Sequence, residues 1–263
     1  MTTSSFAESG TAFSGMSAIV TGGGSGIGQI TATTLVRLGA RVACLDLAPP
    51  QDEGMVRGFA CDVRDDSSVR VAVAAASQWL GGVDVLVNNA GIASIGTLES
   101  QDDDEWQKVF DVNVFGIVRT TRAALPWLKQ SANAAIVNTS SAVARIGLPN
   151  RTLYSATKGA ILAMTRAMAA DYIAVPIRVN CVTPGVVDTP WQARAVAAAP
   201  DPESRLAQLR GMQPNARLVS GEQVAAAIAY LASPASGATT GVDLPVDGGM
   251  QNIHMLSASL ASP

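Results

Sequence analysis

Histidine and cysteine are scarce in this sequence, and their scarcity excludes several kinds of site. His254 is the only histidine, so a Ser-His-Asp hydrolase and a histidine-rich zinc site both fit poorly. Cys44, Cys61 and Cys181 are odd in number and form no CxxC pair, and each lies in an apolar, strand-like run. We therefore expect three reduced, buried thiols, with no disulfide and no metal site.

An excess of positive charge and a long apolar run are also missing. Eighteen Lys and Arg against 21 Asp and Glu give a formal net charge of -3, which does not favour nucleic acid as a partner. No run approaches the roughly 18 to 20 apolar residues of a membrane span. Residues 1–14 read as a flexible polar leader with no export signal, so we expect a soluble, cytoplasmic protein.

Short apolar, β-branched runs alternate with longer helical patterns along the chain. Strands with no polar face are buried on both sides, so this order predicts an α/β fold with a doubly wound parallel sheet, a Rossmann fold. We expect one domain over residues 15–250, a substrate lid at about 188–220, and a C-terminal tail over 251–263. The strands are expected at 17–22, 41–46, 57–63, 83–89, 134–141, 177–183 and 241–246, and the helices at 26–38, 65–79, 102–128, 154–172 and within 190–232.

Two local signals support this order. Gly39 reads as a helix C-cap, because glycine is common just beyond the end of a helix. The acidic run at 102–105 lies where the first turn of a helix favours negative charge, so we interpret it as structural and not as a metal site.

The first strand leads into a glycine-rich turn, "TGGGSGIG". Glycine lets the backbone approach a pyrophosphate, and the helix that follows offers free N–H groups, so the turn indicates a dinucleotide. Gly22, Gly26 and Gly28 are spaced GxxxGxG, which differs from the usual GxGxxG, and no Lys-Ser/Thr pair follows to make a P-loop. A merely flexible turn is the alternative.

Asp46 ends the second strand, 20 residues after Gly26, where a carboxylate can bind an adenosine ribose. A carboxylate there repels a 2′-phosphate, and its neighbours Leu45 and Leu47 are not basic. The cofactor is therefore expected to be NAD and not NADP. A solvated aspartate at a strand end is the alternative.

Tyr154 and Lys158 are four residues apart at the start of a predicted helix, so they share one face. An ammonium ~4 Å from a phenol is worth about 4 kcal/mol at an effective dielectric of 20, enough to lower the phenol pKa by roughly 2 to 3 units. Such a phenolate could take a proton from an alcohol. Ser141, which follows a strand, could bond the substrate oxygen, whereas a surface Tyr-Lys pair is the alternative.

Together these motifs resemble the short-chain dehydrogenase/reductase family over nearly the whole chain. The matches are "TGGGSGIG", Asp62, "NNAG", Asn113, Ser141, "YSATK" and "PGVVDTP". The resemblance implies Tyr154 as base, Ser141 as substrate orienter, Lys158 on the nicotinamide ribose, and Asn113 in a water-linked proton relay. A helix residue bonded to backbone is an equal alternative for Asn113. The positions implied for the cofactor are Gly22, Ser25, Gly26, Ile27, Gly28, Asp46, Asp62, Val63, Asn88, Asn89, Ala90, Gly91, Tyr154, Lys158, Pro184, Val187 and Thr189.

The substrate is less well defined by the sequence. The segment after "PGVVDTP" resembles family members that act on sugars and sugar acids, so we expect oxidation of a secondary alcohol in a small polyhydroxylated substrate. Hydroxysteroids, hydroxyacyl thioesters and a non-catalytic NAD sensor are alternatives. The resemblance also implies a homotetramer. The candidate substrate contacts are Arg145, Arg151, Trp191 and Arg217, although for each single arginine an ordinary surface position is the favoured alternative.

Overall fold

The computed structural model describes residues 11–254, except for the side chain of Trp191. It contains a seven-stranded sheet in the order β3-β2-β1-β4-β5-β6-β9, and all of its strand pairs are parallel. Most of the predicted leader and tail, residues 1–10 and 255–263, lie outside the described residues. The strands are β1 (Ser17–Thr21), β2 (Arg41–Asp46), β3 (Val56–Ala60), β4 (Val85–Asn88), β5 (Ala135–Thr139), β6 (Arg178–Pro184) and β9 (Asp243–Val246).

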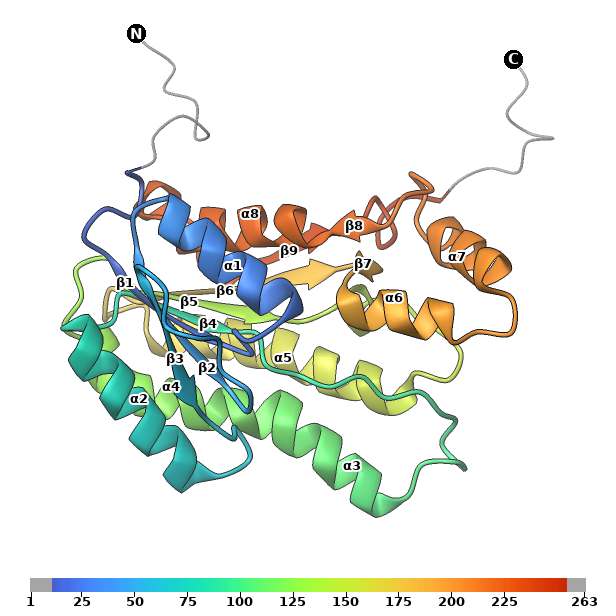
Figure 1. Cartoon of the computed structure of the whole chain (residues 1–263), viewed down its shortest axis with the longest axis horizontal. Helices are drawn as coiled ribbons and strands as arrows, with labels where there is room; N and C mark the ends of the chain where they lie inside the picture. The colour runs from blue at the N-terminus through green and yellow to red at the C-terminus, as the bar shows by residue number, and fades with distance from the viewer. Residues whose placement is uncertain (1–10, 255–263) are drawn as a thin grey trace, which may run out of the picture.

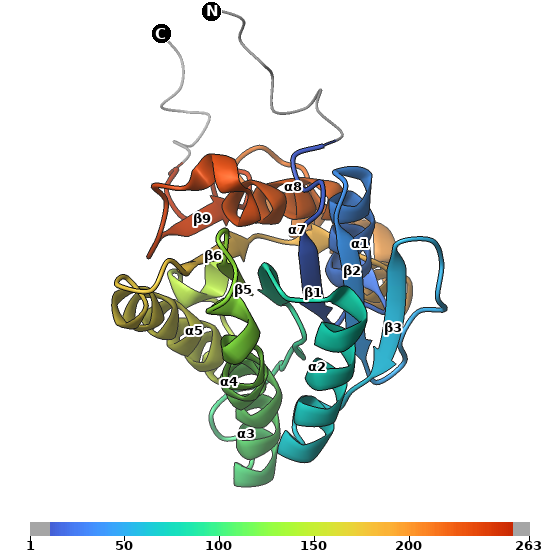
Figure 2. The same cartoon turned by 90° about the vertical axis from the view of Figure 1, so that its left-hand side faces the viewer.

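Helices cover both faces of the sheet, as Figures 1 and 2 show. On one face, Ala18 and Val20 of β1 pack with α1 (Gly26–Arg37) and α8 (Gly221–Ala232). On the other face, Ile19 packs with α2 (Asp66–Leu80) and α4 (Gly116–Leu128), beside which α5 (Thr152–Asp171) lies. The alternation of β1 side chains between two apolar cores confirms the predicted doubly wound sheet.

The predicted helix over 102–128 is interrupted. It consists of α3 (Asp103–Phe110), a π-helical segment (Asp111–Phe115) and α4. Asn113 lies in the π segment and is fully buried, with its amide bonded outside its own helix. The extra residue in this turn re-aims that side chain, which sequence periodicity does not reveal.

The predicted helical region at 190–232 also divides. It contains α6 (Pro190–Ala197), α7 (Pro202–Gly211), the two-residue strand β8 (Val219–Ser220) and α8. β8 pairs in parallel with β7 (Val187–Asp188), so the two ends of the 188–220 segment are joined to each other. Figure 1 shows α6 and α7 beyond the arrowheads of the sheet, on the side where its strands end.

The local signals read from the sequence hold in the structure. Gly39 follows α1 with φ of 101° and donates its N–H to the Val36 carbonyl. Asp102 is the N-cap of α3 and accepts the N–H of Glu105, so the acidic run has the predicted structural role. The three cysteines are buried and free. Within residues 11–254, no helix is long and apolar enough to cross a membrane.

Candidate active site

The glycine-rich turn after β1 is packed too closely for side chains. A Cβ on Gly28 would lie 2.0 Å from the Gly22 carbonyl oxygen, and Gly22 itself has φ of 67°. Gly26 also has a positive φ, 53°. Ser25 is the N-cap of α1, and its side chain makes no capping bond. The turn therefore presents bare backbone and a free hydroxyl at the start of a helix, a geometry that suits a phosphate.

The loop after β4 is fixed to this turn by Thr21. The Thr21 hydroxyl accepts the N–H groups of Asn89 (3.0 Å) and Ala90 (3.1 Å), and Asn89 Nδ2 donates to the Thr21 carbonyl at 3.2 Å. Sequence reasoning missed Thr21, whose only signal is a hydroxyl at the end of the first strand. Asn88, which is also expected to line the cofactor, is buried and bonded to Asn138 (2.9 Å).

Asp46 lies beside the glycine turn, as predicted. Its two carboxylate oxygens accept the N–H groups of Gly24 and Ala48, each at 3.0 Å. A Cβ on Gly24 would approach the Asp46 carboxylate to 3.0 Å. The carboxylate is thus held at the end of β2 by backbone donors.

Asp62 and Val63 follow β3, which is shorter than predicted and ends at Ala60. Asp62 is paired with Arg64 at 2.7 Å, and the hydrogen bonds from Arg64 hold the pKa of that carboxyl below its usual range. A Cβ on Gly116 would meet the Val63 side chain at 3.1 Å, so Val63 packs against the start of α4.

Tyr154 and Lys158 lie one turn apart near the start of α5. Lys158 is buried and donates from Nζ to the Thr139 carbonyl at 2.9 Å; its ammonium lies 5.6 Å from the centroid of the Tyr154 ring. Ser141 interacts with Tyr154 and lowers the pKa of its phenol. The three residues predicted to act together are therefore brought together at the ends of β5 and the start of α5.

The electrostatics of this group differ from the sequence expectation. Burial raises the pKa of the Tyr154 phenol, and the opposing influences are the charge of Arg151 and the hydrogen bond to Ser141, not the charge of Lys158. Burial also lowers the pKa of Lys158 to about 8. The expected lowering by Lys158 was wrong for the free protein, because sequence spacing does not show how strongly both groups are desolvated.

Asn113 connects the loop after β4 to α5. It accepts the Ile92 N–H at 2.8 Å and donates to the Ile92 carbonyl at 2.9 Å and to Thr157 Oγ1 at 3.2 Å. Thr157 in turn donates to the Tyr154 carbonyl at 2.8 Å. Both the oxygen and the nitrogen of the Asn113 amide are thus hydrogen-bonded, as the structural alternative expects. The backbone partner, however, is in the loop after β4 and not in the helix of Asn113 itself.

The segment after β6 carries the remaining cofactor candidates. Pro184 ends β6, Val187 begins β7, and Thr189 is the N-cap of α6, where its hydroxyl accepts the Gln192 N–H at 3.2 Å. Gln213, which sequence reasoning missed, is buried and donates to the carbonyls of Val186 and Arg217. It ties the far end of α7 to the segment that follows β6.

The candidate substrate residues separate in the structure. Arg145 pairs with Asp243 on β9 at 2.5 Å, so its charge already has a partner in the protein. Arg217 is exposed, and Trp191 lies in α6 with a side chain outside the described part of the chain. Arg151 is half-buried beside the Tyr154 group.

Comparison with known proteins places this geometry in a family. A family model described as enoyl-(acyl carrier protein) reductase matches residues 22–251. Cis-4-hydroxycyclohexanecarboxylate dehydrogenase of Sinomonas cyclohexanicum is 38% identical over 91% of this chain and 98% of its own length. For 2-(S)-hydroxypropyl-CoM dehydrogenase 3 of Xanthobacter autotrophicus, the identity is 34% over 89% of this chain and 96% of that protein.

A solved structure is also similar to this chain, in both fold and sequence. The ligand-free aldohexose dehydrogenase of Thermoplasma acidophilum has a TM-score of 0.88 and 33% identity, covering 94% of this chain and 98% of that one. Its fold, the family match and the dehydrogenase relatives agree with one another. The chain belongs to the short-chain dehydrogenase/reductase family of oxidoreductases.

Proposed function

We propose that the protein oxidises a secondary alcohol of a small polyhydroxylated substrate, a sugar or sugar acid, to a ketone or lactone, with NAD as the hydride acceptor. The observation that carries the proposal is the convergence of Ser141, Tyr154 and Lys158 at one end of the sheet. The dehydrogenases similar to this chain, including one for aldohexoses, support alcohol oxidation.

A nicotinamide dinucleotide fits the residues at this edge of the sheet. Backbone atoms of Gly22 already fill the space that a Cβ on Gly28 would need. The Ser25 side chain makes no capping bond, so it and the first N–H groups of α1 can bind the pyrophosphate. The Asp46 carboxylate would bind the adenosine ribose and repel a 2′-phosphate. NAD supplies the hydride acceptor when it is bound.

The chain's own residues perform the proton transfer. Ser141 hydrogen-bonds the substrate oxygen, and Tyr154 takes the hydroxyl proton as general base. Lys158 would hold the nicotinamide ribose, and the positive charge of Arg151 opposes the effect of burial on the Tyr154 pKa. Asn113 holds Ile92 and Thr157 in place and anchors the water-linked route by which the proton leaves.

The segment at 188–220 is proposed as the substrate lid of a single domain. None of the α6 side chains that the structure describes is buried, and Leu209 is the buried residue of α7. The pairing of β7 with β8 closes the base of this segment. Such a segment can move over the substrate without disturbing the sheet.

Replacing Tyr154 tests the function. Tyr154→Phe is expected to lower kcat by about 10² to 10⁴, while NADH binding stays nearly intact, because the phenol hydroxyl is removed and the ring is kept. Tyr172→Phe, at the other end of α5, is the matched control. The measurement is NADH formation against sugars, sugar acids, polyols, hydroxysteroids and hydroxyacyl thioesters. Unchanged turnover in Tyr154→Phe would refute the role of the phenol, and a steroid or thioester as best substrate would favour the alternative substrates.

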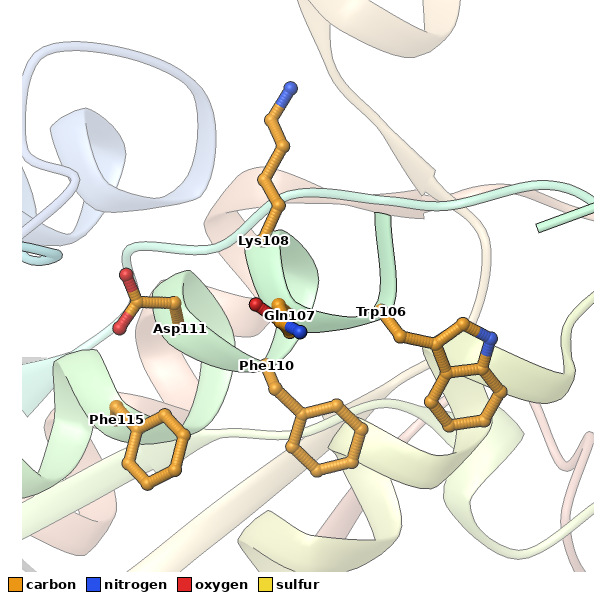
Figure 3. A pocket seen from close by; sticks show the side chains of 6 residues that line it. All are labelled: Trp106, Gln107, Lys108, Phe110, Asp111 and Phe115. Atoms are coloured by element: carbon orange, nitrogen blue, oxygen red, sulfur yellow. The ribbon is translucent and has the colours of Figure 1, made fainter. Parts of the chain in front are cut away.

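We also propose a homotetramer in the cytoplasm. Trp106 and Phe110 stack with ring centroids 6.0 Å apart, and Phe115 is 50% exposed. Figure 3 shows these three rings lining one pocket on the outer side of α3 and the π segment. An apolar outer face of this kind supports burial by another copy. Light scattering is expected to show a tetramer, and Phe115→Asp is expected to weaken it.

A further inference from the structure

Arg64 holds the carboxylate of Asp62 through three N–H groups. Its backbone N–H donates to Oδ1 at 2.9 Å, and Nη2 donates to Oδ2 at 2.7 Å. Its Nε–H is shared between the two oxygens, at 3.0 Å from Oδ1 and 3.1 Å from Oδ2. Such a bidentate pair fixes the plane of the carboxylate as well as its position. The Asp62 side chain is still 28% exposed, so a ligand can reach it.

The backbone around Asp62 is fixed independently of Arg64. The N–H of Cys61 donates to the Asp46 carbonyl at 2.8 Å, which joins this segment to the strand end that carries the ribose candidate. The Asp62 N–H donates to Ser68 Oγ at 3.0 Å, and the Asp62 carbonyl accepts the Asp65 N–H at 3.1 Å. The guanidinium of Arg64 therefore controls the orientation of the Asp62 side chain and not the course of the chain.

Val63 offers a second group beside this carboxylate. Its carbonyl accepts Nη1 of Arg119 at 3.1 Å, and its side chain packs against Gly116. Its N–H, in contrast, has no acceptor within residues 11–254. A carboxylate acceptor and a free N–H donor on neighbouring residues match the edge of adenine that presents an amino donor and the N1 acceptor.

The number of donors on Asp62 decides what the carboxylate can still accept. A carboxylate has about four lone-pair sites, so the three N–H groups of Arg64 leave about one. We propose that Arg64 is a positioning residue for the cofactor, which holds Asp62 so that its remaining site is kept for the adenine amino group. Arg64 thereby makes the protein select adenine over a base with a carbonyl at that position. The proposal rests on the dinucleotide site proposed above.

The test compares NADH with reduced nicotinamide hypoxanthine dinucleotide, in which a carbonyl replaces the amino group and N1 carries a hydrogen. The wild type is expected to bind NADH at least about tenfold more tightly, because hypoxanthine reverses both contacts. Arg64→Met keeps a long side chain and removes the guanidinium. It is expected to weaken NADH by about fivefold and to leave the hypoxanthine analogue nearly unchanged. Calorimetry measures both dissociation constants without turnover.

Two further variants separate positioning from folding and from charge. Arg70→Met removes a guanidinium that is paired with Asp66 at 3.2 Å on the surface of α2, and it should leave both dissociation constants unchanged. Arg64→Lys keeps the charge without the fork, so it should restore only part of the preference. Full restoration by lysine would overturn the bidentate role. Equal weakening of both dinucleotides in Arg64→Met would show a merely structural role, and tighter NADH binding would show that Arg64 competes with adenine; either result overturns the proposal.

These outcomes are distinct from failure of the proposed function. A preference for NADH that depends on Arg64, without oxidation of any alcohol, would support the positioning role and contradict the dehydrogenase function. Alcohol oxidation by a wild type that binds both dinucleotides equally would support the dehydrogenase and overturn the role of Arg64. If NADPH binds more tightly than NADH, NAD as the hydride acceptor is wrong, and the same ratio measured with NADPH and its hypoxanthine analogue decides the role of Arg64.

Discussion

The glycine turn and the segment at 188–220, which we propose as the lid, are built differently. In the turn, the approach of Gly28 to Gly22 leaves no space for a single methyl group. In the lid, α7 buries Leu209, and its Gly211 has open space around it. The turn is thus fixed by backbone packing, whereas the segment proposed as the lid is attached through a few contacts. This contrast suits an enzyme that keeps its cofactor site rigid while its lid moves.

Adding a methyl group to Gly28 in the turn and to Gly211 in the lid segment should give the largest difference between the two regions. Gly28→Ala forces the Gly22 carbonyl or α1 to move, because the clash at 2.0 Å is with backbone. We expect NAD binding to weaken by at least ~100-fold, and the melting temperature to fall by several degrees, since overpacking of this kind costs ~1–3 kcal/mol. Calorimetry with NAD and thermal unfolding are the measurements.

Gly211→Ala is the matched variant on the lid. Its added Cβ meets no atom within 4 Å, and alanine favours a helix over glycine, so the melting temperature should stay or rise slightly. If both variants bind NAD alike, the contrast between the two sides is wrong.

The sequence could predict the features that depend on local backbone demands. The glycine spacing, Asp46 at its strand end and the Tyr154–Lys158 pair are each set within a few residues, and the structure brings them to one edge of the sheet. Thr21 and Gln213 were missed because their partners lie on segments far apart in the chain. The direction of the Tyr154 pKa was missed because burial is a property of the whole fold.

Removing the charge of Asp46 should change cofactor choice. Asp46→Asn keeps an oxygen for the Gly24 N–H and removes the repulsion of a 2′-phosphate, worth ~1–2 kcal/mol at ~5 Å in water. The ratio of kcat/KM for NAD over NADP is expected to fall by about tenfold. Steady-state kinetics with both cofactors measures it, and an unaltered ratio contradicts the ribose role.

Replacing Lys158 tests how much the burial of its ammonium costs in folding stability. Its pKa is lowered from 10.5 to about 8, so below pH 8 the folded protein holds a buried charge that the unfolded chain exposes to water. Lys158→Met should therefore abolish activity yet raise the melting temperature at pH 7 by several degrees, for a gain of ~1–3 kcal/mol.

The pH dependence gives the sign of this effect. Between pH 8 and 10.5 the unfolded state binds more protons at this group than the folded state, so wild-type stability at Lys158 rises with pH and the gain of the variant shrinks. Lys129→Met, an exposed lysine, is the control. A gain that stays constant up to pH 10.5 would show that burial of the ammonium is not its cause.

Gln213 should give the smallest effect and the one most confined to the lid. Its amide is buried and donates to the carbonyls of Val186 and Arg217 at the base of the segment. Gln213→Ala leaves these carbonyls without that donor, at a cost of ~1–2 kcal/mol in local stability. Because the contacts join the lid and not the strands, local opening should increase about tenfold while the melting temperature falls by only a few degrees.

Hydrogen exchange of 190–217 measures the opening, and Gln208→Ala on the exposed side of α7 is the control. Faster exchange spread equally over β1 and α1 would mean that the lid and the cofactor turn unfold as one unit.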